Sequence, residues 1–111
     1  MLMKFKQRRT MFQKKSNIDY KFNEGALIKE LQSYIDKTYE GHYSKNQFQS
    51  TEFIIDCGHG MGFALGNVLK YAQRYGKKQG YNRADLMKIL HYTIIALDCH
   101  DRNENNRLQN D

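Results

Sequence analysis

The 111-residue chain contains no proline. Proline breaks helices and occupies many turns, so its absence leaves long segments free to be helical. Those segments carry apolar residues at helical spacing rather than in strict alternation. Both features predict an all-α protein, a small helical domain of about three to four helices with an extended basic N-terminal arm.

Cysteine and long apolar runs are also scarce. Cys57 and Cys99 are the two cysteines, which excludes the disulfide framework of small secreted proteins. No apolar run approaches the roughly 18 residues that cross a bilayer, and the basic N-terminus lacks the apolar segment of a signal peptide. We expect a cytoplasmic protein with no membrane partner. Zinc would require Cys57, His59, Cys99 and His100 to meet without any C-x-x-C pair, so we expect no metal and no cofactor.

Acidic residues are rare only at the beginning of the chain. Residues 1–22 contain seven basic side chains and one acidic side chain, and they carry the whole formal net charge of +6. We therefore divide the chain into a basic arm (1–22), a helical domain (23–101) and a polar C-terminal tail (102–111). The arm either packs on a neighbour or stays mobile, or it contacts nucleic acid or a host protein. A domain this small buries little surface, which favours a homo-oligomer.

The first half of the domain predicts two helices. One covers about residues 24–39, with Asn23 as its N-cap and Gly41 at its end. Residues 42–49 are polar and predict a loop. Ser50 or Thr51 then caps a short helix over 51–57. The apolar face of the first helix consists of Leu27, Leu31, Tyr34 and Ile35.

Glycines at positions 58, 60, 62 and 66 separate this short helix from the next one. Their spacing is neither G-x-G-x-x-G nor a Walker-type loop, and no βαβ unit follows. A backbone nest that binds phosphate is one explanation. Close packing of the chain at the glycines is the other, and we prefer it.

The helix predicted over about residues 61–76 has two different faces. One face is an apolar stripe that we expect to be buried, and Gly76 ends the helix. The other face presents amide, ammonium, phenol and guanidinium groups, which together suit an anionic ligand. The apolar stripe consists of Leu65, Val68, Leu69 and Ala72, and the polar row of Asn67, Lys70, Tyr71 and Arg74, followed by Lys77 and Lys78.

The last predicted helix begins after Asn82, which we expect to be its N-cap. Asp85, Lys88 and Tyr92 share one side of it. The tail from residue 102 onwards is predicted to be frayed. The side expected to be buried consists of Leu86, Ile89, Leu90, Thr93, Ile94 and Leu97.

These residues resemble the phage SaV-like domain family over about residues 42–98. The family includes a small podophage nucleotide kinase that acts on deoxynucleoside monophosphates. The resemblance rests on the Gly66-Asn67-x-x-Lys70-Tyr71-x-x-Arg74 segment and the later Asp85-x-x-Lys88. It is carried further by His42-Tyr43, Glu52, Ile54, Asp56, Phe63, Gly76-Lys77-Lys78 and Tyr92.

The resemblance implies an oligomeric phage protein of the host cytoplasm that handles nucleotides. If the two motif helices pack antiparallel, their polar rows face one cleft. ATP would be the co-substrate of a kinase, whose catalytic residues the sequence does not assign. The alternatives are a non-catalytic sponge for a host immune signalling nucleotide and a protein that engages a host factor. The nucleotide-binding residues are expected to be His42, Asn67, Lys70, Tyr71, Arg74, Lys77, Lys78, Asp85, Lys88 and Tyr92.

Overall fold

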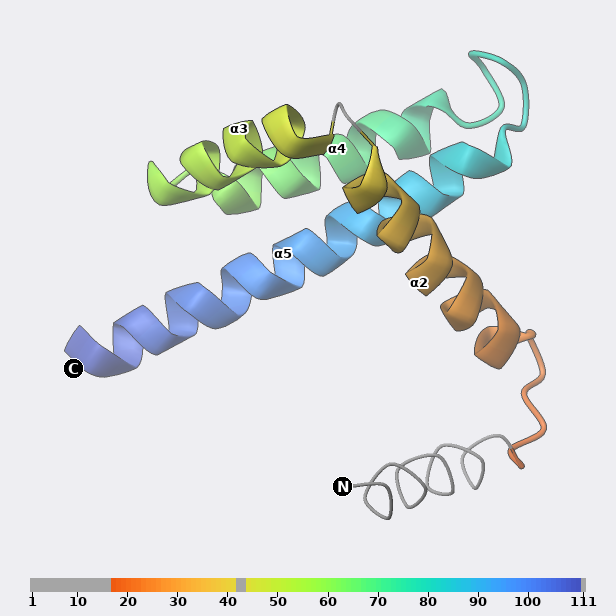
Figure 1. Cartoon of the computed structure of the whole chain (residues 1–111), viewed down its shortest axis with the longest axis horizontal. Coiled ribbons are helices and arrows are strands. Elements are labelled where there is room, and N and C mark those ends of the chain that lie inside the picture. Colours follow the sequence, from red (N-terminus) through yellow and green to blue (C-terminus); the bar gives the residue numbers. More distant parts are fainter. Residues whose placement is uncertain (1–16, 42–43, 111) are drawn as a thin grey trace.

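The structure, a computed structural model, describes residues 17–41 and 44–110. Within these residues the regular structure is entirely α-helical, which confirms the predicted fold class (Figure 1). His42 and Tyr43, and residues 1–16 of the predicted basic arm, lie outside the described residues. The helices are α2 (Glu24–Glu40), α3 (Ser44–Asp56), α4 (Gly60–Arg74) and α5 (Arg83–Asn110).

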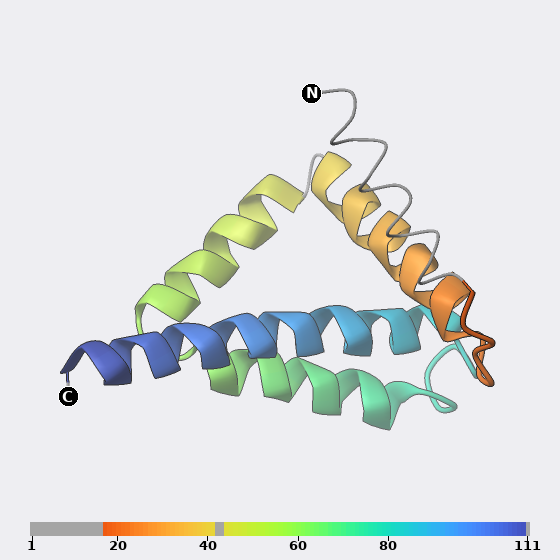
Figure 2. The ribbon, with the colours of Figure 1, turned by 90° about the horizontal axis from the view of Figure 1, so that it is seen from below.

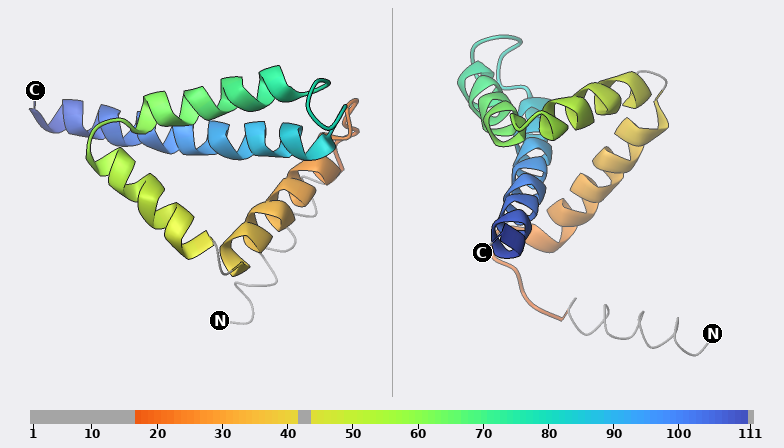
Figure 3. Two further views of the ribbon diagram at one scale, coloured as in Figure 1. Left: turned by 90° about the horizontal axis from the view of Figure 1, so that it is seen from above. Right: turned by 90° about the vertical axis from the view of Figure 1, so that its left-hand side faces the viewer.

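An antiparallel hairpin of α4 and α5 forms the base of the domain (Figure 2). These two helices share the most extensive contact in the described part of the chain. α2 and α3 both lie on one side of the hairpin. The C-terminal end of α2 approaches the N-terminal end of α3, so that α2, α3 and the hairpin form the three sides of a triangle (Figures 2 and 3). One side of the hairpin is therefore covered by helices, and the other side is not.

The turn of the hairpin depends on Gly76. Its φ of 85° lies in the left-handed region, and its N–H donates to the Gly80 carbonyl at 3.0 Å. A Cβ at this position would lie 2.8 Å from Cε1 of Tyr81. Asn82 then begins α5, because its side-chain oxygen accepts a hydrogen bond from the Ala84 N–H at 3.0 Å. Both the end of α4 near Gly76 and the Asn82 cap were predicted correctly.

α3 begins earlier than its sequence suggests. Residues 44–49 are helical rather than a loop, so Ser50 and Thr51 lie within the helix and do not cap it. Thr51 instead donates its hydroxyl to the Gln47 carbonyl at 3.0 Å. We attribute the early beginning of α3 to Phe48, which stacks on Tyr39 of α2 with ring centroids 4.3 Å apart. That contact crosses from one helix to another and leaves no local sequence signal.

The corner between α3 and α4 is closely packed at Gly60. A Cβ there would lie 2.8 Å from both Cys99 Sγ and Ile55 Cγ1. This supports close packing as the role of at least one glycine in the run. Two smaller corrections concern the helix ends. Asn23 makes no side-chain cap to α2, and the expected frayed tail after residue 101 continues α5 to Asn110.

The core is small, and α4 presents a different face to it than expected. The predicted apolar stripes are largely exposed, with Leu69 at 70% and Leu97 at 60% of their full accessibility. The inward face of α4 is instead the row that contains Ala64 and the half-buried Asn67, Tyr71 and Arg74. Small residues at positions 60 and 64 allow α5 to approach this row. The buried residues are Thr51, Gly60, Ala64, Asp85, Met87, Ala96 and Cys99.

None of the described helices is both long enough and apolar enough to cross a bilayer.

Candidate functional site

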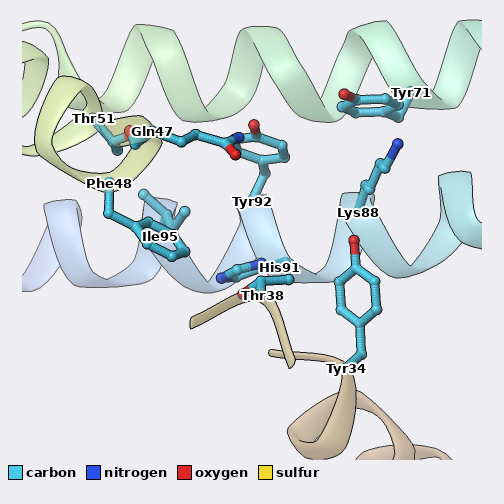
Figure 4. A pocket seen from close by; sticks show the side chains of 10 residues that line it. All are labelled: Tyr34, Thr38, Gln47, Phe48, Thr51, Tyr71, Lys88, His91, Tyr92 and Ile95. Atoms are coloured by element: carbon cyan, nitrogen blue, oxygen red, sulfur yellow. Dashed lines mark hydrogen bonds between the residues drawn. The ribbon is translucent and has the colours of Figure 1, made fainter. Parts of the chain in front are cut away.

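A cavity of about 240 Å³ lies where the four helices meet, on the covered side of the hairpin (Figure 4). Every helix contributes to its lining, and five of the side chains are aromatic or imidazole rings. Its wall is therefore mostly apolar, with a few polar groups placed around it. The lining residues are Tyr34 and Thr38 of α2, Gln47, Phe48 and Thr51 of α3, Tyr71 of α4, and Lys88, His91, Tyr92 and Ile95 of α5.

Tyr71 and Tyr92 form the centre of one wall. Their rings are nearly parallel, at 16°, with centroids 6.0 Å apart. Three cationic side chains approach the Tyr71 ring. Lys88 Nζ lies 4.9 Å from its centroid, Lys70 Nζ 5.2 Å and Arg74 Cζ 6.0 Å. The negative face of an aromatic ring attracts cations at these distances. Positive charge is therefore concentrated beside an aromatic surface.

Helical spacing explains why these groups meet. Arg74 lies one turn beyond both Lys70 and Tyr71 on α4. Lys88 and Tyr92 are four residues apart on α5, and therefore share one face of that helix. The antiparallel hairpin sets the two faces opposite each other. Of these five side chains, Tyr71, Lys88 and Tyr92 face one cavity as expected, while Lys70 and Arg74 approach the Tyr71 ring from outside the cavity wall.

Arg74 also contacts a buried carboxylate. Its Nε lies 3.8 Å from Oδ1 of Asp85, a residue with no solvent exposure. Neither carboxylate oxygen of Asp85 accepts a hydrogen bond from any described residue. Burying an unpaired charge is costly, and the guanidinium of Arg74 supplies the opposite charge that compensates the carboxylate of Asp85. The pair ties the end of α4 to the beginning of α5, and neither residue lines the cavity.

The remaining predicted residues are dispersed. Asn67 donates its side-chain N–H to the Phe63 carbonyl at 2.9 Å, within its own helix. Lys77 and Lys78 are exposed in the hairpin turn and do not line the cavity. His42 lies outside the described residues. The structure therefore places Tyr71, Lys88 and Tyr92 in the cavity wall, with Lys70 beside them.

Several lining residues escaped the sequence reasoning. Tyr34 and Thr38 are four residues apart on α2, and His91 and Ile95 are four residues apart on α5. The sequence shows that the members of each pair share one face of a helix. It does not show which other helix that face contacts. His91 meets the edge of Tyr34, with ring centroids 6.3 Å apart and planes at 88°. His91 is therefore a residue of the cavity wall.

Burial keeps the polar rings of this cavity uncharged. It lowers the pKa of His91 from its ordinary value of 6.5, which favours neutral imidazole. Burial also raises the pKa of Tyr34 and of Tyr92, and the neighbouring Tyr71 hydroxyl raises both further. Each phenol therefore keeps its proton at neutral pH and can donate a hydrogen bond. Among the ten lining residues, Lys88 alone carries a formal charge.

A second cavity of about 300 Å³ lies between α2 and α5. Two of its charged groups pair with each other, because Arg83 Nη2 donates to Glu30 Oε1 at 2.8 Å and a second bond joins Nη1 to Oε2. The hydrogen bond from Arg83 lowers the pKa of Glu30. The charges of Arg83 and Glu30 neutralise each other, and Lys37 also lines this cavity. The second cavity differs from the first mainly in having Tyr34 as its one aromatic ring.

The residues considered for a zinc site lie on two segments of the chain. Cys99 lies against Gly60, so the two segments that carry Cys57, His59, Cys99 and His100 do come together. No group of three or more histidine, cysteine or acidic side chains with suitable placement for a metal occurs in the described part of the chain.

Comparison with curated proteins and with solved structures gave no match. The DUF3310 family, described as a protein of unknown function, matches residues 37–93. This range includes the end of α2, all of α3 and α4, and the first turns of α5. It contains every residue of the first cavity except Tyr34 and Ile95. Because the match spans just over half of its length, the chain belongs to the DUF3310 family.

Proposed function

We propose that this protein binds a mononucleotide in the cavity formed by α2, α3, α4 and α5. The observation that carries the proposal is the placement of Lys88 and Lys70 around Tyr71, which is itself stacked on Tyr92. A nucleotide combines the two features that this surface complements. Its base has a flat aromatic face, and its phosphate is an anion.

The chemistry of the wall divides naturally between the two parts of such a ligand. Tyr92, Phe48 and His91 offer ring faces and edges for stacking with a base. Gln47 and Thr38 carry donors and acceptors for the polar edge of the base. Lys88 provides the charge for the phosphate, and Lys70 extends that charge outside the cavity wall.

The size of the cavity favours a small ligand. Its volume of about 240 Å³ is below the roughly 300–1,000 Å³ that is usual for ligand pockets. We therefore expect the base and sugar to occupy the cavity, with the phosphate at the lysine side. A cyclic dinucleotide or another large signalling nucleotide needs more room. We therefore favour a nucleoside monophosphate over the signalling-nucleotide sponge.

Transfer of a phosphoryl group is the second candidate activity. The SaV-like resemblance implies a deoxynucleoside monophosphate kinase, and such transfer relies on positioning and charge neutralisation. The observation that favours it is the cationic cluster around Tyr71, where Lys70 lies outside the cavity wall and could meet the phosphates of a second nucleotide. Binding alone requires fewer groups, so it is the primary proposal.

Isothermal titration calorimetry with deoxynucleoside and ribonucleoside monophosphates tests binding. We expect Lys88→Gln to weaken binding of the preferred monophosphate about tenfold or more, as for loss of a charged phosphate contact. Lys29→Gln, an exposed lysine of α2 away from this cavity, is the matched control and should bind normally. Equal affinities of the two variants, or no binding by the wild type, would reject the proposed site. Tight binding of cyclic dinucleotides instead would favour the sponge.

The kinase alternative needs a separate measurement. The protein is incubated with a labelled deoxynucleoside monophosphate, ATP and Mg²⁺, and the products are separated. Formation of the diphosphate by the wild type, and its loss in Lys88→Gln but not in Lys29→Gln, would support transfer. If the protein binds the monophosphate but the monophosphate is recovered unchanged, the result would support binding and reject phosphoryl transfer.

A further inference from the structure

The uncovered face of the α4–α5 hairpin is strongly apolar. α2 and α3 cover one side of the hairpin (Figure 3). Helical periodicity places the exposed apolar stripe of each hairpin helix away from the residues that line the cavity on that side. We call this surface the leucine face. Its large side chains are all at least two-fifths exposed. It consists of Leu65 and Leu69 of α4 with Leu86, Leu90, Ile94 and Leu97 of α5, and the exposed Thr93 lies among them.

The leucine face lacks charge along its whole length. Lys70 is the one charged residue between positions 60 and 73, and Lys88 is the one between 86 and 97. Both lysines approach the ring of Tyr71, whose side chain lines the cavity on the covered side. The two helices thus send their charges to one side and their leucines to the other. In a monomer this distribution leaves the more hydrophobic stripe of each helix, the one with the leucines, exposed to water.

We propose that a second copy of this chain covers the leucine face, hairpin against hairpin, about a two-fold axis. A face without charge can pair with itself, as an isologous interface requires. It also resembles a domain core cut in half, the usual character of a permanent homodimer interface. The four paired helices would form the bundle core that the described helices lack within one copy, where the buried apolar side chains are Ala64, Met87, Ala96 and Cys99.

The dimensions of the face are those of a compact helix-pair surface. Residues 86–97 of α5 extend over about 17 Å, and two packed helices are roughly 20 Å wide. The projected area is therefore about 350 Å² per copy, before the relief of the side chains is counted, which is within the roughly 300–600 Å² of the largest apolar patches on monomers, many of them functional. The ends of the face differ in charge. Lys77 and Lys78 lie at the turn, whereas the exposed Asp101 continues the stripe at the far end.

An antiparallel two-fold arrangement brings these ends together. The turn of one copy then lies near the Asp101 end of its partner, so that opposite charges meet across the rim. A membrane surface would favour basic residues along both borders of the face. In this hairpin Lys70 and Lys88 approach the ring of Tyr71 instead, and Arg102 pairs with Asp98. Charge complementarity therefore favours a second copy as the occupant.

Analytical ultracentrifugation of the full chain between about 1 and 100 μM tests the proposal. We expect a wild-type dimer, and a shift to monomer with at least about 100-fold weaker association in Leu90→Glu. Leu27→Glu is the matched control, because Leu27 is an exposed leucine on α2, outside the face. A wild-type monomer, or equal association of the two variants, would overturn the proposal. So would a monomer that sediments with anionic lipid vesicles through the leucine face.

Cysteine cross-linking keeps the test decisive if Leu90→Glu folds poorly. In a Cys57→Ser background, Thr93→Cys places a thiol near the middle of the leucine face, and mild oxidation should give a disulfide-linked dimer. Ser33→Cys, exposed on α2, should remain largely monomeric under the same conditions. Cross-linking of Thr93→Cys no greater than that of Ser33→Cys would count against hairpin pairing.

Discussion

The guanidinium of Arg74 approaches the buried carboxylate of Asp85, with Nε 3.8 Å from Oδ1. The contact joins the last turn of α4 to the first turn of α5 across the hairpin. It also helps to explain why α4 turns its polar row inward. With Arg74 held towards Asp85, Tyr71 faces α5 one turn earlier and meets Tyr92 and Lys88. A structural ion pair thus positions the ring at the centre of the proposed binding site.

Loss of one partner of this pair should destabilise the hairpin. We expect Arg74→Met to lower the free energy of unfolding by about 3 kcal/mol, because it leaves the Asp85 carboxylate buried and uncompensated. Adding Asp85→Asn should recover part of that loss, since the remaining group is neutral. Urea denaturation followed by circular dichroism measures both. If Arg74→Met keeps wild-type stability but abolishes nucleotide binding, Arg74 is a ligand residue rather than a structural one.

Two glycines of the same run should respond oppositely to alanine. Gly60→Ala forces a methyl group against Cys99 and Ile55, and we expect a loss of about 1–3 kcal/mol. Gly66 lies within α4 with open space around the position of a Cβ. Gly66→Ala should therefore stabilise the helix by about 0.5–1 kcal/mol. Thermal and urea unfolding of the two variants compare them, and similar effects would contradict the close contact at the α3–α4 corner.

The stability of the protein should decrease as the pH falls below neutrality, in part because of His91. Burial lowers the pKa of His91 in the folded state below its ordinary value of 6.5. The unfolded chain therefore takes up a proton first, and the stabilising contribution present above pH 6.5 is lost as the pH falls towards the folded-state pKa. Unfolding free energies measured from about pH 8 to about pH 5 should show this slope. His91→Gln should reduce it, whereas His100→Gln, at an exposed position, should not.

The ring of Tyr71 should matter more for ligand binding than its hydroxyl. Tyr71→Phe retains the surface that stacks on Tyr92 and faces Lys88, so monophosphate affinity should change little. Tyr71→Ala removes that surface, and we expect about tenfold weaker binding, as for loss of one stacking contact. Calorimetry on the two variants separates the effects. Equal losses in both would assign the main role to the hydroxyl group.

Local signals were sufficient for much of the fold. Asn82 caps α5 through its own side chain, and Gly76 supplies a left-handed turn that other residues rarely adopt. Each of these features depends on a few neighbouring residues, so each could be read without the rest of the chain. The expected meeting of Tyr71, Lys88 and Tyr92 also follows from helical spacing, once a short turn makes the hairpin antiparallel.

The composition of the cavity could not be predicted in the same way. Tyr34, Gln47 and His91 enter it because α2 and α3 lean over the hairpin, a relationship between segments distant in sequence. The early beginning of α3 has a similar cause, the stacking of Phe48 on Tyr39. Neither contact changes the local pattern of apolar residues, which is the signal that sequence reasoning uses.

Local sequence patterns were enough to establish that the described chain is helical and approximately where its helices lie. Helix propensity, caps and spacing are local properties, and they survive any arrangement of the helices. The buried face of α4, in contrast, depends on how the helices pack against one another. Hydrophobicity favoured Leu65 and Leu69, but close approach at Gly60 and Ala64 and the charge on Asp85 turned the other face inward. The leucines remain outside because burial depends on neighbours as well as on hydrophobicity.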